Sequence, residues 1–118
     1  MNEKFDSELL RGSLDIVVLS ALNDGPKYGY LLQQKVRESS GGRVDLQAGT
    51  LYPLLQKLEA DKLVRTKWDD STGRRRKWYE LTAAGQKQLA KQARAWCDYV
   101  ECLRGMLAPI VSPKLKPS

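Results

Sequence analysis

The spacing of four leucines within residues 48–61 constrains the fold more than any other feature of the sequence. They lie at positions i, i+3, i+4 and i+7, on one face of a helix: Leu51, Leu54, Leu55 and Leu58. The opposite face is not apolar, since it carries Gly49, Pro53 and Gln56. The pattern predicts a helix that packs on a core with its leucines and exposes its other side. Pro53 lacks a backbone donor, which predicts a bend in this helix or a start nearer Thr50.

Two further amphipathic segments precede this helix. Apolar residues recur with helical spacing from Leu10 to Leu22, and the Asp-Gly-Pro sequence at 24–26 predicts the end of that helix. The same spacing runs from Tyr28 to Val36, and Ser-Ser-Gly-Gly at 39–42 closes this second helix. The first part of the chain is therefore predicted to form three successive helices.

A β-hairpin is predicted after the three helices. Residues 64–69 alternate between two faces, residues 76–81 are rich in aromatic residues, and Asp-Ser-Thr-Gly at 70–73 is typical of a turn. Four consecutive basic residues occupy the tip and the start of the second strand: Arg74, Arg75, Arg76 and Lys77. The aromatic residues Trp68, Trp78 and Tyr79 could stack on the bases of a single strand. We expect them instead to pair across the strands and to cover the core.

A fourth helix is predicted after Thr82, whose hydroxyl can cap it. Its apolar residues are spaced by 4, 3, 4, 3 and 4 positions, which is the heptad pattern of a seam between helices: Leu89, Ala93, Trp96, Val100, Leu103 and Leu107. This seam can pack on its own domain or on a second copy of the chain. We expect it to do both, because it is too short for a stable isolated coiled coil. Pro109, Pro113 and Pro117 predict a flexible tail over residues 109–118.

Charge limits the choice of partner. The 118 residues suffice for one domain with a small extra element. The formal net charge of +6 is uneven, with −1 in residues 1–46, +3 in residues 47–81 and +4 in residues 82–118. A polyanion is therefore a plausible partner for the second and third blocks.

Composition argues against catalysis and against a membrane location. The chain has no histidine and only two cysteines, Cys97 and Cys102, so imidazole catalysis and a thiolate metal site are excluded. We predict no enzymatic activity and no cofactor. No apolar run approaches the roughly 20 residues that cross a bilayer, and the polar start is no secretory signal. These features predict a cytoplasmic protein.

The order of the elements predicts a mainly α fold with a β-hairpin, of the α+β class. We expect a winged helix-turn-helix over residues 1–81, a dimerisation helix over residues 82–108 and the tail. The helix of residues 48–61 would project beside a basic hairpin. The DNA major groove, about 12 Å wide, admits one helix, and cations of the hairpin can meet the flanking phosphates.

Four stretches of the chain carry a family resemblance: LRGSLD at 10–15, GPKYGY at 25–30, AGTLYPLLQKLE at 48–59 and GRRRKWYELTAAG at 73–85. Together they resemble the PadR family of bacterial transcriptional regulators, in its small subfamily with a single C-terminal helix. The resemblance implies a homodimeric winged-helix repressor that binds a pseudo-palindromic operator in double-stranded DNA. Two positions depart from the family pattern: Tyr28 stands where histidine is frequent, and Lys62 where a glycine usually ends the third helix.

The resemblance also implies which residues meet DNA. They are Gln47, Thr50, Tyr52 and Lys57 of the third helix and, in the wing, Gly73, Arg74, Arg75, Arg76 and Lys77. We add Gln56, whose amide can contact a base edge. The arginines are expected to contact phosphates, which positions the protein without reading sequence. The rival hypothesis is a winged-helix module that binds another protein and no duplex DNA.

Trp96 is a candidate ligand-binding residue. In some relatives a tryptophan on this helix lines a flat pocket between protomers and stacks on planar drugs. By this resemblance a planar aromatic small molecule is the predicted effector, held by stacking and cation–π attraction. The alternative is that Trp96 belongs only to the interface core.

Overall fold

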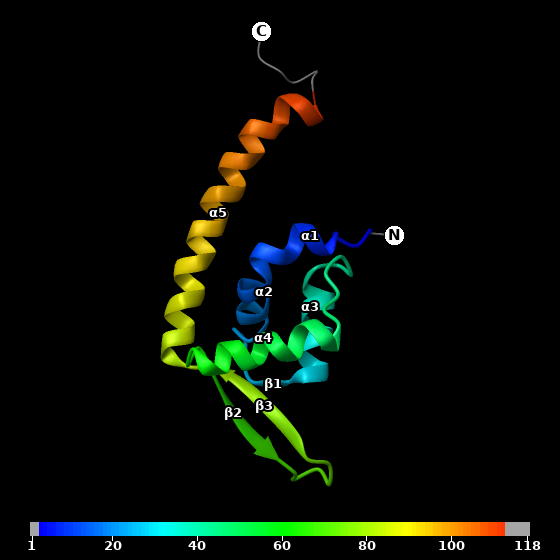
Figure 1. Ribbon diagram of the computed structural model, residues 1–118, viewed down its shortest axis with the longest axis vertical. Helices are drawn as coiled ribbons and strands as arrows, with labels where there is room; N and C mark the ends of the chain where they lie inside the picture. The colour runs from blue at the N-terminus through cyan, green and yellow to red at the C-terminus, as the bar shows by residue number, and fades with distance from the viewer. Residues whose placement is uncertain (1–2, 113–118) are drawn as a thin grey trace.

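The computed structural model describes residues 3–112, and Figure 1 shows the arrangement of their helices and strands. In chain order the elements are α1 (Ser7–Leu10), a 3-10 turn (Arg11–Ser13), α2 (Leu14–Ala21), β1 (Lys27–Tyr28), α3 (Gly29–Ser39), α4 (Ala48–Ala60), β2 (Val64–Asp69), β3 (Arg76–Leu81) and α5 (Ala83–Val111). The order confirms the predicted winged-helix fold, with a long helix added at its end.

The core forms where α2, α3 and α4 meet. Its largest fully buried side chains come from these three helices, from the residue that follows α2 and from β2: Val18, Leu19, Leu22, Leu32, Leu51, Leu55, Leu58 and Val64. Three of the four leucines that define the apolar face of α4 are 0% exposed, and Leu54 packs at the edge of the same cluster. Burial of this face makes the opposite side of α4 the outward one.

The start of the chain differs from the single helix predicted over Leu10–Leu22. The segment is divided into α1, the 3-10 turn and α2. Gly12 favours helix weakly, and the Ser13 hydroxyl donates a hydrogen bond of 3.0 Å to the Leu10 carbonyl. These two residues interrupt a helix that the apolar spacing alone predicts as continuous.

The hairpin belongs to a three-stranded sheet of order β1-β3-β2. The pairs are antiparallel, and β2 and β3 pair from Val64↔Leu81 to Asp69↔Arg76. Tyr28, predicted to begin the second helix, instead lies in β1 opposite Trp78. Their rings meet edge to face with centroids 5.0 Å apart. A two-residue strand has no periodicity, which is why the sequence did not reveal it.

Helix α4 begins without a side-chain cap and ends without the usual glycine. The amides of Thr50 and Leu51 both donate to the Gln47 carbonyl, so the alternative of a start nearer Thr50 is wrong, and Pro53 lies inside the helix. After the helix, Lys62 adopts a left-handed conformation with φ of 62°. The amide of Leu63 donates to the Leu58 carbonyl at 2.9 Å, the pattern of a Schellman cap. Lys62 therefore takes the glycine position despite the steric cost of its Cβ.

Helix α5 is anchored at its start and extends far beyond the domain (Figure 1). The Thr82 hydroxyl accepts a hydrogen bond from the Gly85 amide at 2.9 Å, as the capping prediction requires. Gly85 lies so close to the loop before β2 that a Cβ there would be 2.0 Å from the Leu63 carbonyl oxygen. This contact fixes the point from which α5 leaves the domain.

The predicted flexible tail over residues 109–118 is wrong for residues 109–111, which continue α5. Pro109 removes one backbone donor near the helix end, and the residue four positions earlier, whose carbonyl the ring crowds, is Gly105. The helical hydrogen-bond pattern continues past Pro109, since the Ser112 amide donates to the Ala108 carbonyl at 2.9 Å. Residues 113–118 lie outside the described residues. Across residues 3–112, no helix combines the length and the apolar character needed to span a membrane.

Candidate nucleic-acid interface

The outward face of α4 carries most of the predicted contact residues. Gln47, which precedes the helix, and Thr50, Tyr52, Gln56 and Lys57 are all exposed. They are exposed because the leucines of the same helix are turned into the core. The helix thus presents polar groups to solvent along this face.

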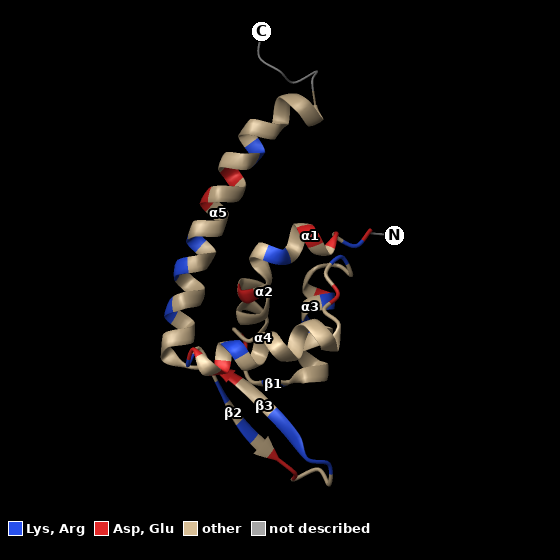
Figure 2. Cartoon of the chain, viewed as in Figure 1, with Lys and Arg blue, Asp and Glu red and all other residues tan. Residues whose placement is uncertain are grey.

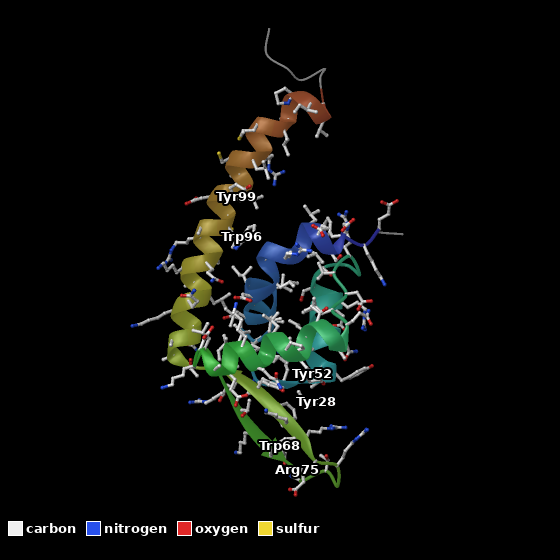
Figure 3. The ribbon with its side chains drawn as sticks, viewed as in Figure 1. Tyr28, Tyr52, Trp68, Arg75, Trp96 and Tyr99 are labelled. Carbon is white, nitrogen blue, oxygen red and sulfur yellow. The ribbon has the colours of Figure 1, made fainter. Side chains whose placement is uncertain are left out.

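An open groove lies between this region and the hairpin. Figure 3 labels four of the side chains that line it, Tyr28, Tyr52, Trp68 and Arg75. The groove is lined by Tyr28, Gly29 and Tyr30 at the start of α3, by Tyr52 of α4, and by Trp68, Arg74, Arg75, Arg76, Lys77 and Tyr79 of the hairpin. The groove brings Tyr52 together with the four basic residues of the wing. The other predicted contacts, Gln47, Thr50, Gln56, Lys57 and Gly73, do not line it.

The tyrosine of α4 fits against the start of α3. Tyr52 packs over Gly29, the first residue of that helix. A Cβ on Gly29 would lie 2.0 Å from the Tyr52 hydroxyl oxygen and 2.7 Å from its Cζ. A side chain at residue 29 would therefore displace the Tyr52 ring from this position.

Two wing arginines lie over aromatic rings. The guanidinium carbon of Arg75 is 4.3 Å from the centroid of the Trp68 ring, and that of Arg76 is 4.4 Å from the centroid of Tyr28. Within residues 3–112, no carboxylate lies within ion-pair distance of Arg74, Arg75 or Arg76. Arg76 stands opposite Asp69 across the hairpin, so its charge is partly offset there. Arg74 and Arg75 suit contact with a polyanion.

The two lysines of the predicted site are compensated. Lys57 pairs with Asp15 of α2 at 3.2 Å, and Lys77 lies 3.6 Å from Glu59 of α4. Glu59 also accepts a hydrogen bond of 2.9 Å from Thr66 of β2. This carboxylate therefore links α4 to both strands of the hairpin and helps to fix the groove.

The conformation of the hairpin turn requires a glycine at residue 73. Gly73 has φ of 82°, and its amide donates to the Asp70 carbonyl at 3.0 Å. Asp69 accepts a hydrogen bond of 2.9 Å from the Ser71 amide, which lowers the pKa of that carboxyl below its usual value. Gly73 therefore shapes the turn that carries Arg74 and Arg75. Figure 2 shows the basic run on the β3 side of this turn.

Comparison with known proteins agrees with this geometry. The model of the PadR-like family of transcriptional regulators matches residues 18–91. The chain belongs to this family. Membership and the winged-helix fold make it a DNA-binding transcriptional regulator.

Individual relatives cover most of the PadR-like chain. It is 35% identical over 88 residues to a transcriptional regulator of Mycobacterium tuberculosis, a match covering 75% of this chain and 79% of the relative. The structure of a PadR family regulator from Eggerthella lenta is similar with a TM-score of 0.74 and 33% identity, over 85% of this chain and 86% of that one. The structure of a transcriptional regulator from Clostridium thermocellum is similar with a TM-score of 0.77 and 25% identity, over 86% of this chain and 96% of that one.

The sequence misjudged one hairpin aromatic of this PadR-like protein. Tyr79 is buried and Trp78 is half-buried, but Trp68 is 52% exposed and does not cover the core. Trp68 shares its strand face with Val64 and Thr66, and burial decreases along this face because the hairpin projects past α4. Tyr28 and Tyr30 were also missed as groove residues, since only the fold brings the start of α3 to the wing.

The predicted seam on α5 divides into two parts. Leu89 is buried in the domain, and Ala93 and Trp96 are half-buried beside it. Trp96 meets the ring of Tyr99 edge to face at 6.0 Å. In the distal part Leu103 is half-buried, and the other large apolar residues are exposed: Tyr99, Val100, Met106, Leu107, Ile110 and Val111. The domain therefore covers only the first half of the seam.

The contact between Gly29 and Tyr52 gives a stability prediction. Gly29→Ala should lower the free energy of unfolding by about 1–3 kcal/mol, because the new methyl group overpacks the Tyr52 ring. Urea denaturation followed by circular dichroism measures the change. In a Tyr52→Ala background the same substitution should cost much less, because the ring is gone.

The matched control is Gly49→Ala on α4, where a Cβ would meet nothing within 4 Å. It should raise stability by about 0.5–1 kcal/mol, because alanine favours helix over glycine. An equal cost of Gly29→Ala with and without Tyr52 would contradict the steric account.

Proposed function

We propose that this protein is a homodimeric, sequence-specific regulator that binds a pseudo-palindromic operator and represses transcription by occluding a promoter in the cytoplasm. One observation carries the proposal: the polar face of α4 is exposed beside wing arginines that have no carboxylate partner within the described chain. A helix of this kind fits the major groove while the arginines meet the backbone.

The roles of the residues follow from their chemistry. Gln47, Thr50 and Gln56 are exposed at α4 and can reach base edges through amide and hydroxyl groups. Arg74 and Arg75 are exposed at the wing and suit phosphate oxygens. Tyr52 and Lys57 are assigned to the sugar-phosphate backbone. Contact of Lys57 with a phosphate requires it to leave Asp15, and an exposed pair of this kind contributes only about 0–1 kcal/mol.

The uncovered half of α5 supports the dimer. Its exposed apolar residues form a stripe that no other described element covers, and a second copy of the same helix would bury it. A two-fold dimer presents two recognition helices to half-sites about 34–36 Å apart. The symmetry of the operator would then follow from the symmetry of the protein.

We further propose that a planar aromatic cation relieves repression by binding at Trp96 near the dimer axis. The ring is half-buried and adjoins Tyr99, so an aromatic surface is available there. Such a ligand must bind the two states of the dimer with different affinity, because otherwise it shifts no equilibrium. Its binding would change the spacing or tilt of the two recognition helices.

The DNA contact is tested with Arg75→Ala. Affinity for any duplex should fall, and the slope of log affinity against log salt should become less steep by about 0.9, because one phosphate contact is lost. Fluorescence anisotropy with a labelled duplex at several salt concentrations measures both quantities. The control is Lys87→Ala, which removes an equal charge from the exposed surface of α5. It should change neither the affinity nor the salt slope.

The wild-type protein should also give a footprint on a promoter that it controls, its own upstream region being the first to examine. Unchanged affinity of the Arg75→Ala variant would contradict the role of the wing. A wild-type chain without affinity for any duplex would favour the protein-interaction module instead.

The dimer is tested with Leu107→Asp. The buried carboxylate should dissociate the dimer, since an unpaired charge in an apolar interface is strongly unfavourable. Light scattering at several concentrations measures the mass. Arg94→Asp is the control, because residue 94 is exposed and none of the residues three or four positions from it belongs to the apolar stripe. A Leu107→Asp variant that remains dimeric would exclude the seam as the interface.

The effector site is tested by tryptophan fluorescence. Planar aromatic cations should quench the emission, and the quenching should disappear in Trp96→Ala while Trp68 and Trp78 remain. Quenching of equal size in that variant would assign the ligand to another part of the protein.

A further inference from the structure

We propose that Trp68 is a positioning residue for DNA binding, which acts by holding the guanidinium group of Arg75 at the edge of the groove. The inference rests on the proposed function. Trp68 lies near the end of β2, is 52% exposed and has Arg75 above its ring at 4.3 Å. In Figure 3 the two side chains lie together near the tip of the hairpin.

The core does not require this indole. Val64, on the same strand face, is 2% exposed, and Tyr79 of β3 is 5% exposed, so the interior ends before Trp68. The residue opposite Trp68 is Lys77, whose ammonium lies 6.0 Å from its ring and 3.6 Å from Glu59. Among residues 3–112, the Trp68 ring thus meets Lys77, which is tied to a carboxylate, and Arg75, which has no carboxylate within ion-pair distance.

Stacking and phosphate binding are compatible in one arginine. The five N–H donors of a guanidinium lie in its plane, whereas the aromatic ring covers a face. Arg75 can therefore remain on Trp68 and still donate to a phosphate. A free arginine loses much of its rotamer entropy when it binds, and an arginine already stacked loses less. Trp68 would raise affinity without a DNA contact of its own.

The groove holds a second arrangement of this kind. Arg76 lies 4.4 Å above the ring of Tyr28, on the side nearer α3. Tyr28 also packs on Trp78 and belongs to β1, so its removal would disturb the sheet as well. Trp68 is the cleaner test because its ring is the more exposed one and lies outside the core.

The test is a double-mutant cycle with Trp68→Leu and Arg75→Ala. Trp68→Leu should weaken binding to every duplex by about two- to fivefold, the effect of one exposed cation–π contact. The salt slope should stay as in wild type, because the number of phosphate contacts is unchanged. In the Arg75→Ala background Trp68→Leu should have no further effect. Trp68→Phe should recover part of the affinity, since it keeps a ring.

Three results would overturn the inference. Wild-type affinity of Trp68→Leu would show that the stack does not matter. An equal loss with and without Arg75 would mean that the indole meets DNA directly. A Trp68→Leu chain that no longer folds, judged by circular dichroism and thermal melting, would assign Trp68 a structural role. A wild-type chain without duplex affinity would instead overturn the proposed function itself, so the two failures are distinguishable.

Discussion

Burial of the leucine face of α4 is the constraint on which the rest of the structure depends. Leu51, Leu55 and Leu58 are fully buried in the core. Because this face of the helix is fixed, the polar face is the one that is turned to solvent. The Glu59 carboxylate on the same helix then holds both strands of the hairpin through Thr66 and Lys77. One packed helix thereby orients the recognition surface and the wing together.

Charge pairing divides the basic residues of the site into two kinds. Lys57 and Lys77 lie beside carboxylates, so they contribute to the internal geometry of the domain. Arg75 and Arg76 lie over aromatic rings and have no carboxylate within ion-pair distance in the described chain. An aromatic face holds a guanidinium without neutralising its charge, which leaves the attraction for a polyanion intact. The wing is therefore both ordered and positively charged.

Helix α5 contributes its first turns to the core of the domain and leaves its distal turns outside it. Its first turns add Leu89 to the core and are locked by the close approach of Gly85 to Leu63. Its distal turns project beyond the domain and leave apolar side chains uncovered. The longest extent of the molecule is 64 Å. A continuous helix thus connects the uncovered apolar stripe to the domain that carries α4. That connection is what regulation by a ligand near Trp96 would need.

The sequence by itself determined which faces are apolar and therefore the three-helix core, the hairpin, the cap at Thr82 and the heptad seam of α5. Periodicity is a local property, and these elements depend on little else. It also predicted the basic run of the wing and the exposed face of α4. Only the tertiary structure decided that β1 pairs with β3, that Lys62 takes a left-handed cap and that Lys57 meets Asp15. It also decided that Trp68 lies outside the core under Arg75. Except for the local cap at Lys62, each of these depends on where separate elements meet, and the distance between residues distant in sequence is set by packing.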